Sequence, residues 1–238
     1  MLFSCYYTGA PDPQGKGQMA IDDDIKVEPL IGDCERLGVE LTIFHDLLSE
    51  SFCQKWSSDL IQFARVPVTP IYSVCDYRTF CIRDWLQNHE YETVWYCDLF
   101  DVRMNRHPET MLDLFPEHDL FLGIESGALK NNLDTSDGRW MVNKFKKTYG
   151  DVPPESLNQT ILAAGHWGGT FEAANRFCNL LCEEFERVNA GRNNLNMAVF
   201  NQVAYRDIGQ ENFWADGYPF NSEFRAFDLN ADAVFIHK

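Results

Sequence analysis

Two carboxylates end an apolar segment of the chain. Asp98 and Asp101 follow residues 93–97, which contain hardly a polar side chain. Acidic groups at the end of a buried strand are costly unless a cation meets them. Two side chains from one short loop leave coordination positions open on a divalent ion, which suits Mg²⁺ or Mn²⁺ held partly by a substrate's phosphates. The ordinary alternative is a turn capped by one aspartate and paired with Arg103 or Arg106.

A second group of candidate ligands lies at the end of the sequence. His237 ends a short apolar segment, and an imidazole nitrogen beside two carboxylates is an acceptable ligand for Mn²⁺. Lys238 next to it offers a point charge to a phosphate. Taken alone, His237 is more simply interpreted as a structural histidine. The hypothesis from the residues is a metal site made of Asp98, Asp101 and His237.

A glycine-rich stretch, residues 165–169 (GHWGG), indicates a strand-to-helix junction where the backbone turns tightly or approaches something closely. Trp167 in this stretch stacks on a sugar ring in one interpretation and fills the core in the other. The chain contains no G-x-G-x-x-G or P-loop spacing, which argues against a dinucleotide enzyme or an NTPase.

The charge of the chain excludes one class of partner. The net charge is −16, the pI is about 4.7, and the longest basic cluster is KFKK at 144–147. Such a surface repels phosphate backbones, so we expect no nucleic-acid binding. A phosphate-bearing substrate would need a metal ion or local Arg and Lys side chains to reverse the field.

Composition and cysteine usage favour an ordinary globular protein. Hydrophobic residues make up 45% of the chain, and its eight cysteines form no C-x-x-C pair. Several of them lie in apolar segments, so we expect buried, reduced thiols of a cytosolic-type compartment. The first residues resemble a strand more than a signal peptide, and no apolar run reaches the roughly 18 residues that span a bilayer. We therefore expect a soluble, cytoplasmic protein that could work at a membrane surface.

The order of the predicted elements indicates an α/β fold. The expected elements are a strand at 2–7, a polar loop at 9–17, a helix at 19–37, strands at 39–44 and 68–72, a helix at 76–88, strands at 93–97 and 120–124, a helix at 138–149, a turn at 151–154, a strand ending in 165–169, helices at 171–189 and 196–207, and a strand at 234–236. Strands that alternate with helices predict a mainly parallel sheet. Ligands bind beyond the carboxyl ends of such strands.

Several segments in this order resemble those of GT-A fold glycosyltransferases. Residues 92–102 (ETVWYCDLFDV) are similar to the aspartate-motif strand in its D-x-x-D version, and 76–80 (DYRTF) to the helix that helps to hold the donor nucleotide. Residues 162–169 resemble the N-A-G-x-x-G-G stretch, and 196–201 (NMAVFN) the D-M-x-x-F-N helix start. Residues 217–222 (GYPFNS) and 236–238 (IHK) follow in the expected order.

The resemblance implies a fold, a reaction and a set of site residues. The fold is a GT-A type, Rossmann-like mixed sheet, mainly parallel and flanked by helices, in one domain over 1–238 with a nucleotide-sugar-binding half (1–105) and an acceptor-binding half (106–238). The activity is metal-dependent transfer of a sugar from a UDP- or GDP-sugar to a glycan or other hydroxyl acceptor, with Mn²⁺ or Mg²⁺ as cofactor. Donor residues are Tyr6, Tyr7, Thr8, Asp76, Arg78, Asp98 and Lys238, and acceptor or sugar residues are Gly165, His166, Trp167, Gly168, Asn196 and Asn201.

Two positions depart from the family pattern. Asn196 stands where an Asp is usual, and Ala164 stands where an Asn-like residue is usual. By the resemblance, the negative group expected near the transferred sugar is then either absent or supplied by another residue, and the acceptor contact expected at position 164 is in question. As acceptor-activating base we nominate Glu125 or Asp216, because we expect each to lie in a loop after an apolar run.

Two other classes of protein remain open from the sequence. A metal-dependent nucleotidyltransferase or phosphohydrolase would use the same acidic strand end together with a second acidic cluster, which we do not see. A non-catalytic carbohydrate- or nucleotide-binding domain would use the two aspartates only to cap turns.

Overall fold

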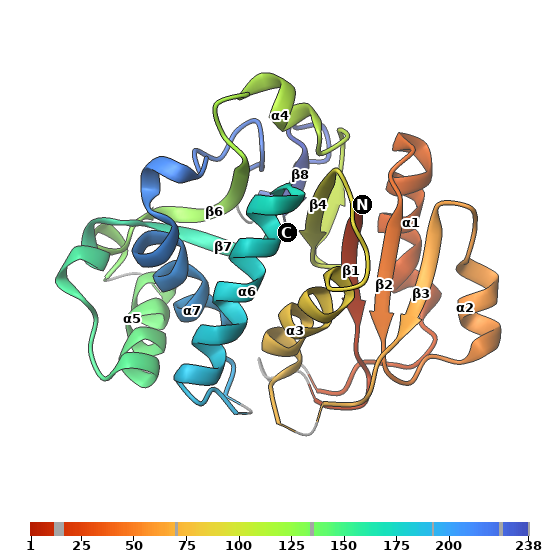
Figure 1. The fold of residues 1–238 in the computed structure, drawn as a ribbon, viewed down its shortest axis with the longest axis horizontal. Coiled ribbons are helices and arrows are strands. Elements are labelled where there is room, and N and C mark those ends of the chain that lie inside the picture. The colour runs from red at the N-terminus through yellow and green to blue at the C-terminus, as the bar shows by residue number, and fades with distance from the viewer. Residues whose placement is uncertain (12–16, 70, 134–135, 192, 224–225, 238) are drawn as a thin grey trace.

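The computed structural model describes residues 1–11, 17–69, 71–133, 136–191, 193–223 and 226–237, so predicted Lys238 lies outside it. Six strands form one sheet in the order β3-β2-β1-β4-β7-β6 (Figure 1). Their bounds are Leu2–Tyr6 (β1), Leu41–His45 (β2), Ile61–Arg65 (β3), Thr93–Cys97 (β4), Leu120–Ala128 (β6) and Thr160–Thr170 (β7). The strands β3, β2, β1 and β4 run parallel, while β7 runs antiparallel to both β4 and β6. The predicted mixed, mainly parallel sheet is confirmed.

Helices cover both faces of this sheet (Figure 1). The helices are Asp24–Leu37 (α1), Glu50–Trp56 (α2), Val74–Leu86 (α3), Thr110–Leu114 (α4), Ser136–Tyr149 (α5), Phe171–Arg187 (α6) and Asn196–Val203 (α7). Along β4 the side chains alternate, so that Tyr96 packs into the core layer of α3 and α6 while Trp95 packs into the layer of α1. An apolar run without polar alternation is therefore buried on both sides, as expected for a central parallel strand.

The sequence prediction fails between residues 50 and 72. In the strand predicted at 68–72 the described residues 68, 69, 71 and 72 form no strand. Thr69 Oγ1 accepts a hydrogen bond from Tyr72 N at 3.1 Å. The third strand is instead β3, and α2 before it was not predicted. Val68 and Ile71 are 39% and 59% exposed, so their apolar character does not mark a buried strand. The Pro67 before them also lacks the N–H that a strand ladder needs.

The other boundaries shift by short distances. The first helix begins at Asp24, where the Asp23 side chain accepts a hydrogen bond from Ile25 N, and ends before Gly38, whose φ of 71° suits glycine. The predicted helix at 196–207 is α7 continued by a π-helical turn, Ala204–Ile208. Short 3-10 helices occur at Leu129–Asn132, Pro154–Asn158 and Gln210–Asn212.

A small second sheet fixes the end of the described chain. The strand Val102–Met104 (β5), which was not predicted, pairs antiparallel with Phe235–His237 (β8). The register places Val102 opposite His237. The last strand is thereby held beside the loop that follows β4, and the strand predicted at 234–236 is shifted by one residue.

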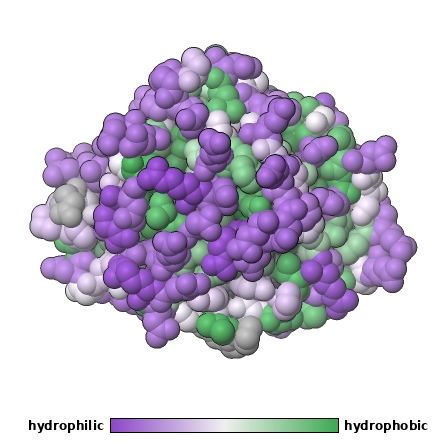
Figure 2. All heavy atoms as spheres, viewed as in Figure 1, coloured by the Kyte–Doolittle hydropathy of each residue, from purple (hydrophilic) through white to green (hydrophobic). Residues whose placement is uncertain are grey.

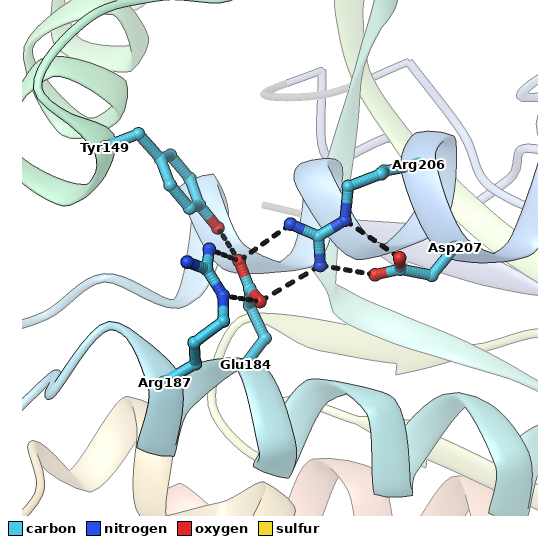
Figure 3. A network of polar contacts seen from close by, with 5 residues as sticks. All are labelled: Tyr149, Glu184, Arg187, Arg206 and Asp207. Carbon is cyan, nitrogen blue, oxygen red and sulfur yellow. Dashed lines mark hydrogen bonds and ion pairs between the residues drawn. The ribbon is translucent and has the colours of Figure 1, made fainter.

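A buried carboxylate joins three helical segments of the second half of the chain (Figure 3). Glu184 on α6 accepts hydrogen bonds from Arg187 on the same helix, from Arg206 in the π-helical turn and from Tyr149 at the end of α5. Its side chain is 2% exposed. Burial raises the pKa of Glu184, but the bonds from Arg187, Arg206 and Tyr149 outweigh that effect and lower the pKa to about 2. The carboxylate is therefore ionised and fully paired at neutral pH.

The surface agrees with the composition. Hydrophilic side chains cover most of the face shown in Figure 2, and apolar side chains are scattered among them. None of the described helices is both long enough and apolar enough to cross a membrane.

Candidate functional site

Asp98 lies where three elements meet at the carboxyl end of β4. Its backbone N–H donates to Gly165 O on β7 at 2.8 Å. Its Oδ1 accepts hydrogen bonds from Arg78 on α3 and from the Tyr96 hydroxyl, the latter at 2.5 Å. Arg78 also donates to the Tyr96 hydroxyl at 2.6 Å and to Ala164 O at 2.8 Å. The aspartate is thus held in one orientation, with its second oxygen left for another contact.

The charges of this group are fixed by burial and pairing. Burial disfavours the Arg78 guanidinium, but the negative charge of Asp98 outweighs this effect and raises the pKa of Arg78. Arg78 therefore stays a cation, and its guanidinium lies 4.7 Å from the Tyr96 ring centroid. Burial raises the pKa of Tyr96 well above its usual value, so its hydroxyl remains a donor.

His237 approaches Asp98 from the other end of the chain. A Cβ built on Gly165 would lie 3.0 Å from Asp98 Oδ2 and 3.3 Å from His237 Nε2. Burial lowers the pKa of His237, while the negative charges of Asp98 and Asp101 oppose that effect without cancelling it. The imidazole is therefore mainly neutral at pH 7, which is the form that binds metals.

The three predicted metal ligands are brought together only in part. Asp98 and His237 converge over Gly165, and Asp101 is near enough to act electrostatically on His237. No group of three or more His, Cys, Asp or Glu side chains within the described ranges is assembled closely enough to hold a metal ion. The donor set of one carboxylate oxygen and one imidazole nitrogen fits Mn²⁺ with open positions, so the metal site stays a prediction.

A solvent-open cleft adjoins this group. The lining comes from the ends of β1 and β4, from α3, from α1 and from the segment around Met19. Its lining residues are Cys5, Tyr7, Ala10, Met19, Lys26, Val74, Cys75, Arg78, Tyr96, Asp98, Leu99, Phe100 and Asp101. Four predicted residues therefore line one cleft, namely Tyr7, Arg78, Asp98 and Asp101.

Other predicted donor residues are buried in the protein. Tyr6 is fully buried, and its hydroxyl donates to Ala20 O at 2.7 Å. Thr8 N donates to Asp46 Oδ1 at 2.8 Å, which anchors the chain after β1. Asp76 is also fully buried, and burial raises its pKa to about 6. None of these three buried residues is among the described residues that line the cleft.

Most of the predicted acceptor residues pack inside the protein. Trp167 is 3% exposed and stacks on Tyr96 with centroids 5.9 Å apart, so it fills the core. A Cβ on Gly168 would lie 2.5 Å from Val94 O, so this glycine lets two strands approach. His166 is fully buried. Asn201 Oδ1 accepts a hydrogen bond from Leu162 N at 2.8 Å and so joins α7 to β7.

The remaining nominations lie elsewhere. Asn196 begins α7, where its Oδ1 accepts a hydrogen bond from Met197 N at 2.8 Å. Asp216 lines a separate pocket beside His118 and Tyr205. Glu125 is a half-buried residue of β6. Neither nominated base is among the described residues that line the cleft, so the structure gives no support to either.

Tyr96 and Lys26 are two of the lining residues that the sequence reasoning did not nominate. Tyr96 carries a recognisable signal, because it precedes Asp98 by two residues and so points to the same side of the strand. Lys26 carries none, because its place in the cleft depends on how α1 packs against the sheet.

Comparisons with known proteins show which fold the chain has. No protein-family model matches the sequence, and no curated protein matches it either. A crystal structure of the galactosyltransferase LgtC in complex with donor and acceptor sugar analogues is similar, with a TM-score of 0.56 over 99% of this chain and 86% of that one. The chain has the GT-A glycosyltransferase fold. Because the identity is 10%, the likeness concerns the path of the chain and assigns no residue.

Proposed function

We propose that the chain is a glycosyltransferase that uses a nucleoside-diphosphate sugar, a hydroxyl acceptor and a divalent cation, Mn²⁺ or Mg²⁺. The observation that carries the proposal is the convergence of Asp98 and His237 over Gly165, beside the open cleft at the carboxyl end of β4. The fold match to a galactosyltransferase supports the same class of activity. A UDP- or GDP-sugar is the donor class, and a glycan is the acceptor class.

The side chains of the site have separable roles in this proposal. Asp98 Oδ2 and His237 Nε2 offer the metal ligands, with Asp101 as the third. A divalent cation there would stabilise the negative charge that develops on the leaving diphosphate. Arg78 acts through Asp98, because it holds Oδ1 and leaves Oδ2 directed toward Gly165. Tyr7, which lines the cleft and is 7% exposed, offers the edge of an aromatic surface for the base.

The reaction breaks the bond between the anomeric carbon and a diphosphate oxygen, and it joins that carbon to the acceptor oxygen. The acceptor hydroxyl loses its proton in the process. An acidic protein of net charge −16 needs positive charge where the diphosphate binds. This need is the physical reason to expect a metal ion beside Asp98.

The test is calorimetric titration of UDP and GDP into the protein in Mn²⁺ and in EDTA, followed by a thermal-shift screen of sugar nucleotides. We expect binding in Mn²⁺, hardly any in EDTA, and loss of the metal-dependent part in Asp98→Asn. Binding that ignored both the metal and the substitution would instead indicate a non-catalytic nucleotide-binding domain. Rapid nucleotide release without any acceptor would indicate a phosphohydrolase.

A further inference from the structure

The described lining of the cleft contains two cationic side chains, and they come from helices on opposite faces of the sheet. Arg78 belongs to α3, and Lys26 belongs to α1. The guanidinium of Arg78 is already committed to Asp98, to the Tyr96 hydroxyl and to Ala164 O. The charge of Arg78 is therefore paired with Asp98, and its guanidinium is poorly placed to bind an incoming anion.

Lys26 differs from Arg78 in its partners. Across the described ranges it forms no ion pair, and its half-buried side chain extends along Phe100. Its Nζ lies 5.6 Å from the centroid of the Phe100 ring, and that ring packs edge-on against Tyr6 at 5.1 Å. A contact between an ammonium group and a ring at a partly exposed site is weak and does not neutralise the charge. The packed ring thus holds a cation at the cleft, and no described residue accepts a hydrogen bond from its ammonium group.

Lys26 carries a positive charge in negatively charged surroundings. Asp98 and Asp101 line the same cleft, and the chain as a whole carries −16. A ligand with a diphosphate would be repelled by this field everywhere except beside a cation. Lysine suits that task, because its compact ammonium group offers three donors on a flexible stem.

We propose that Lys26 binds the diphosphate of the nucleotide donor. The inference rests on the proposed function and names a binding residue for it on α1. Lys26 contributes affinity for the phosphates, while the base and ribose bind without it. Removal of its charge therefore weakens the binding of a nucleoside diphosphate and leaves the binding of the corresponding nucleoside unchanged.

The experiment compares Lys26→Met, Lys26→Arg and Lys55→Met with the unmodified chain. Lys55 on α2 is the matched control, because it is exposed, pairs with Asp24 and lies outside the residues that line the cleft. UDP and GDP are titrated by calorimetry in Mn²⁺, and uridine and guanosine are followed by ligand-observed NMR. A charged hydrogen bond at a half-buried site predicts a loss of about tenfold in diphosphate affinity for Lys26→Met.

The results separate this inference from the proposed function. We expect Lys26→Arg to keep most of the affinity and Lys55→Met to keep all of it. If Lys26→Met weakened the binding of the nucleoside as much as that of the nucleoside diphosphate, the inference would be overturned. Lys26 would then contribute only to the shape of the cleft. Unchanged diphosphate binding would also overturn it while the proposed function stands. Failure of the unmodified chain to bind any nucleotide would sink both.

Discussion

Asp98 Oδ2 and His237 Nε2 both face Gly165, at 3.0 and 3.3 Å from where a Cβ on that residue would lie. One group ends β4 and the other ends β8, so two strands of different sheets meet over a position without a side chain. Contacts this short are tighter than a methyl group normally makes, and the absence of a Cβ leaves room between the two groups. That room is where a metal ion would bind under the proposed function.

Gly165→Ala tests this relationship directly. The added methyl group pushes Asp98 and His237 apart, and we expect Mn²⁺-dependent UDP or GDP affinity to fall by at least about tenfold, in the range that loss of support around a ligand costs. The fold should survive with a loss of about 1 to 3 kcal/mol, because the side chain of Asp98 is 31% exposed and can move. Calorimetry measures the nucleotide affinity, and urea unfolding measures the free energy of unfolding.

The control is Gly32→Ala on α1, where an added Cβ meets nothing within 4 Å. It should leave nucleotide binding unchanged and stabilise the helix slightly. Metal-dependent binding in Gly165→Ala at the level of the unmodified chain would mean that Asp98 and His237 do not act together.

The local part of the fold and site was predictable. The apolar run at 93–97 has to be buried on both faces, and the two aspartates after it mark the carboxyl end of the strand. Period-two alternation then places Tyr96 on the same side as Asp98. These inferences need only neighbouring residues, so they place Asp98 at a strand end, and the resemblance to a known family then makes it a site candidate.

The non-local part was not predictable. His237 gains its position from pairing with β5, whose three residues are too few to give a pattern. Lys26 reaches the cleft through the packing of α1, and the hydroxyl of Tyr6 is used inside the protein on Ala20 O. The half-exposed edge strand β3 lacks the continuous burial that made β4 recognisable, so the more apolar segment at 68–72 was preferred wrongly.

Glu184 should make acid stability depend on pH in a defined window. The pKa of the folded state is about 2 against an ordinary value of 4.5, so the stabilisation is complete above pH 4.5 and is lost as pH falls toward 2. The shift corresponds to roughly 3 kcal/mol. Glu184→Gln should lower the free energy of unfolding by about 2 to 3 kcal/mol at pH 7, and this difference should shrink between pH 4.5 and 3 in urea melts.

The matched control is Glu186→Gln on the same helix. Its carboxylate is 55% exposed and lies 3.5 Å from Arg83, so we expect a loss under about 0.5 kcal/mol at any pH. A Glu184→Gln penalty that stayed constant with pH would show that packing, and not ionisation, is what Glu184 contributes.

Asp76 should behave in the opposite way, because its pKa is raised. Burial raises the pKa from 3.8 to about 6, and Oδ1 has no hydrogen-bond partner among the described residues. The folded state thus binds a proton more readily than the unfolded chain, and stability falls as pH rises from 3.8 through 6. Asp76→Asn should raise the free energy of unfolding at pH 7 by up to about 3 kcal/mol and hardly change it below pH 4.

Thermal melts of Asp76→Asn at pH 4 and pH 7 measure this difference, with Asp84→Asn as the control on the exposed side of α3. The same variants titrated with UDP or GDP show whether the buried charge serves binding. Higher stability with weaker binding would mean that Asp76 is kept ionised for function. Lower stability at pH 7 would contradict the burial argument.

Substitutions at Gly123 and His166 should have strongly coupled effects on the free energy of unfolding. A Cβ on Gly123 would lie 2.1 Å from His166 Nε2, and His166 is fully buried against Phe220 and Phe235 at 5.6 and 5.5 Å. The ring has no space to retreat, so Gly123→Ala should cost at least about 3 kcal/mol of unfolding free energy. In a His166→Ala background the new methyl group enters the space that the ring vacated, and the same change should cost far less.

Urea unfolding of both single variants and the double variant gives the coupling energy, which we expect to be at least about 2 kcal/mol. Gly127→Ala on the same strand is the control, since its Cβ would meet nothing within 4 Å. His166 is also in edge contact with His237, with centroids 5.2 Å apart. Relief of the clash in the double variant with Mn²⁺-dependent binding still lost would show that the His166 ring positions His237. Additive single effects would mean that His166 moves aside, and the described packing around it would be wrong.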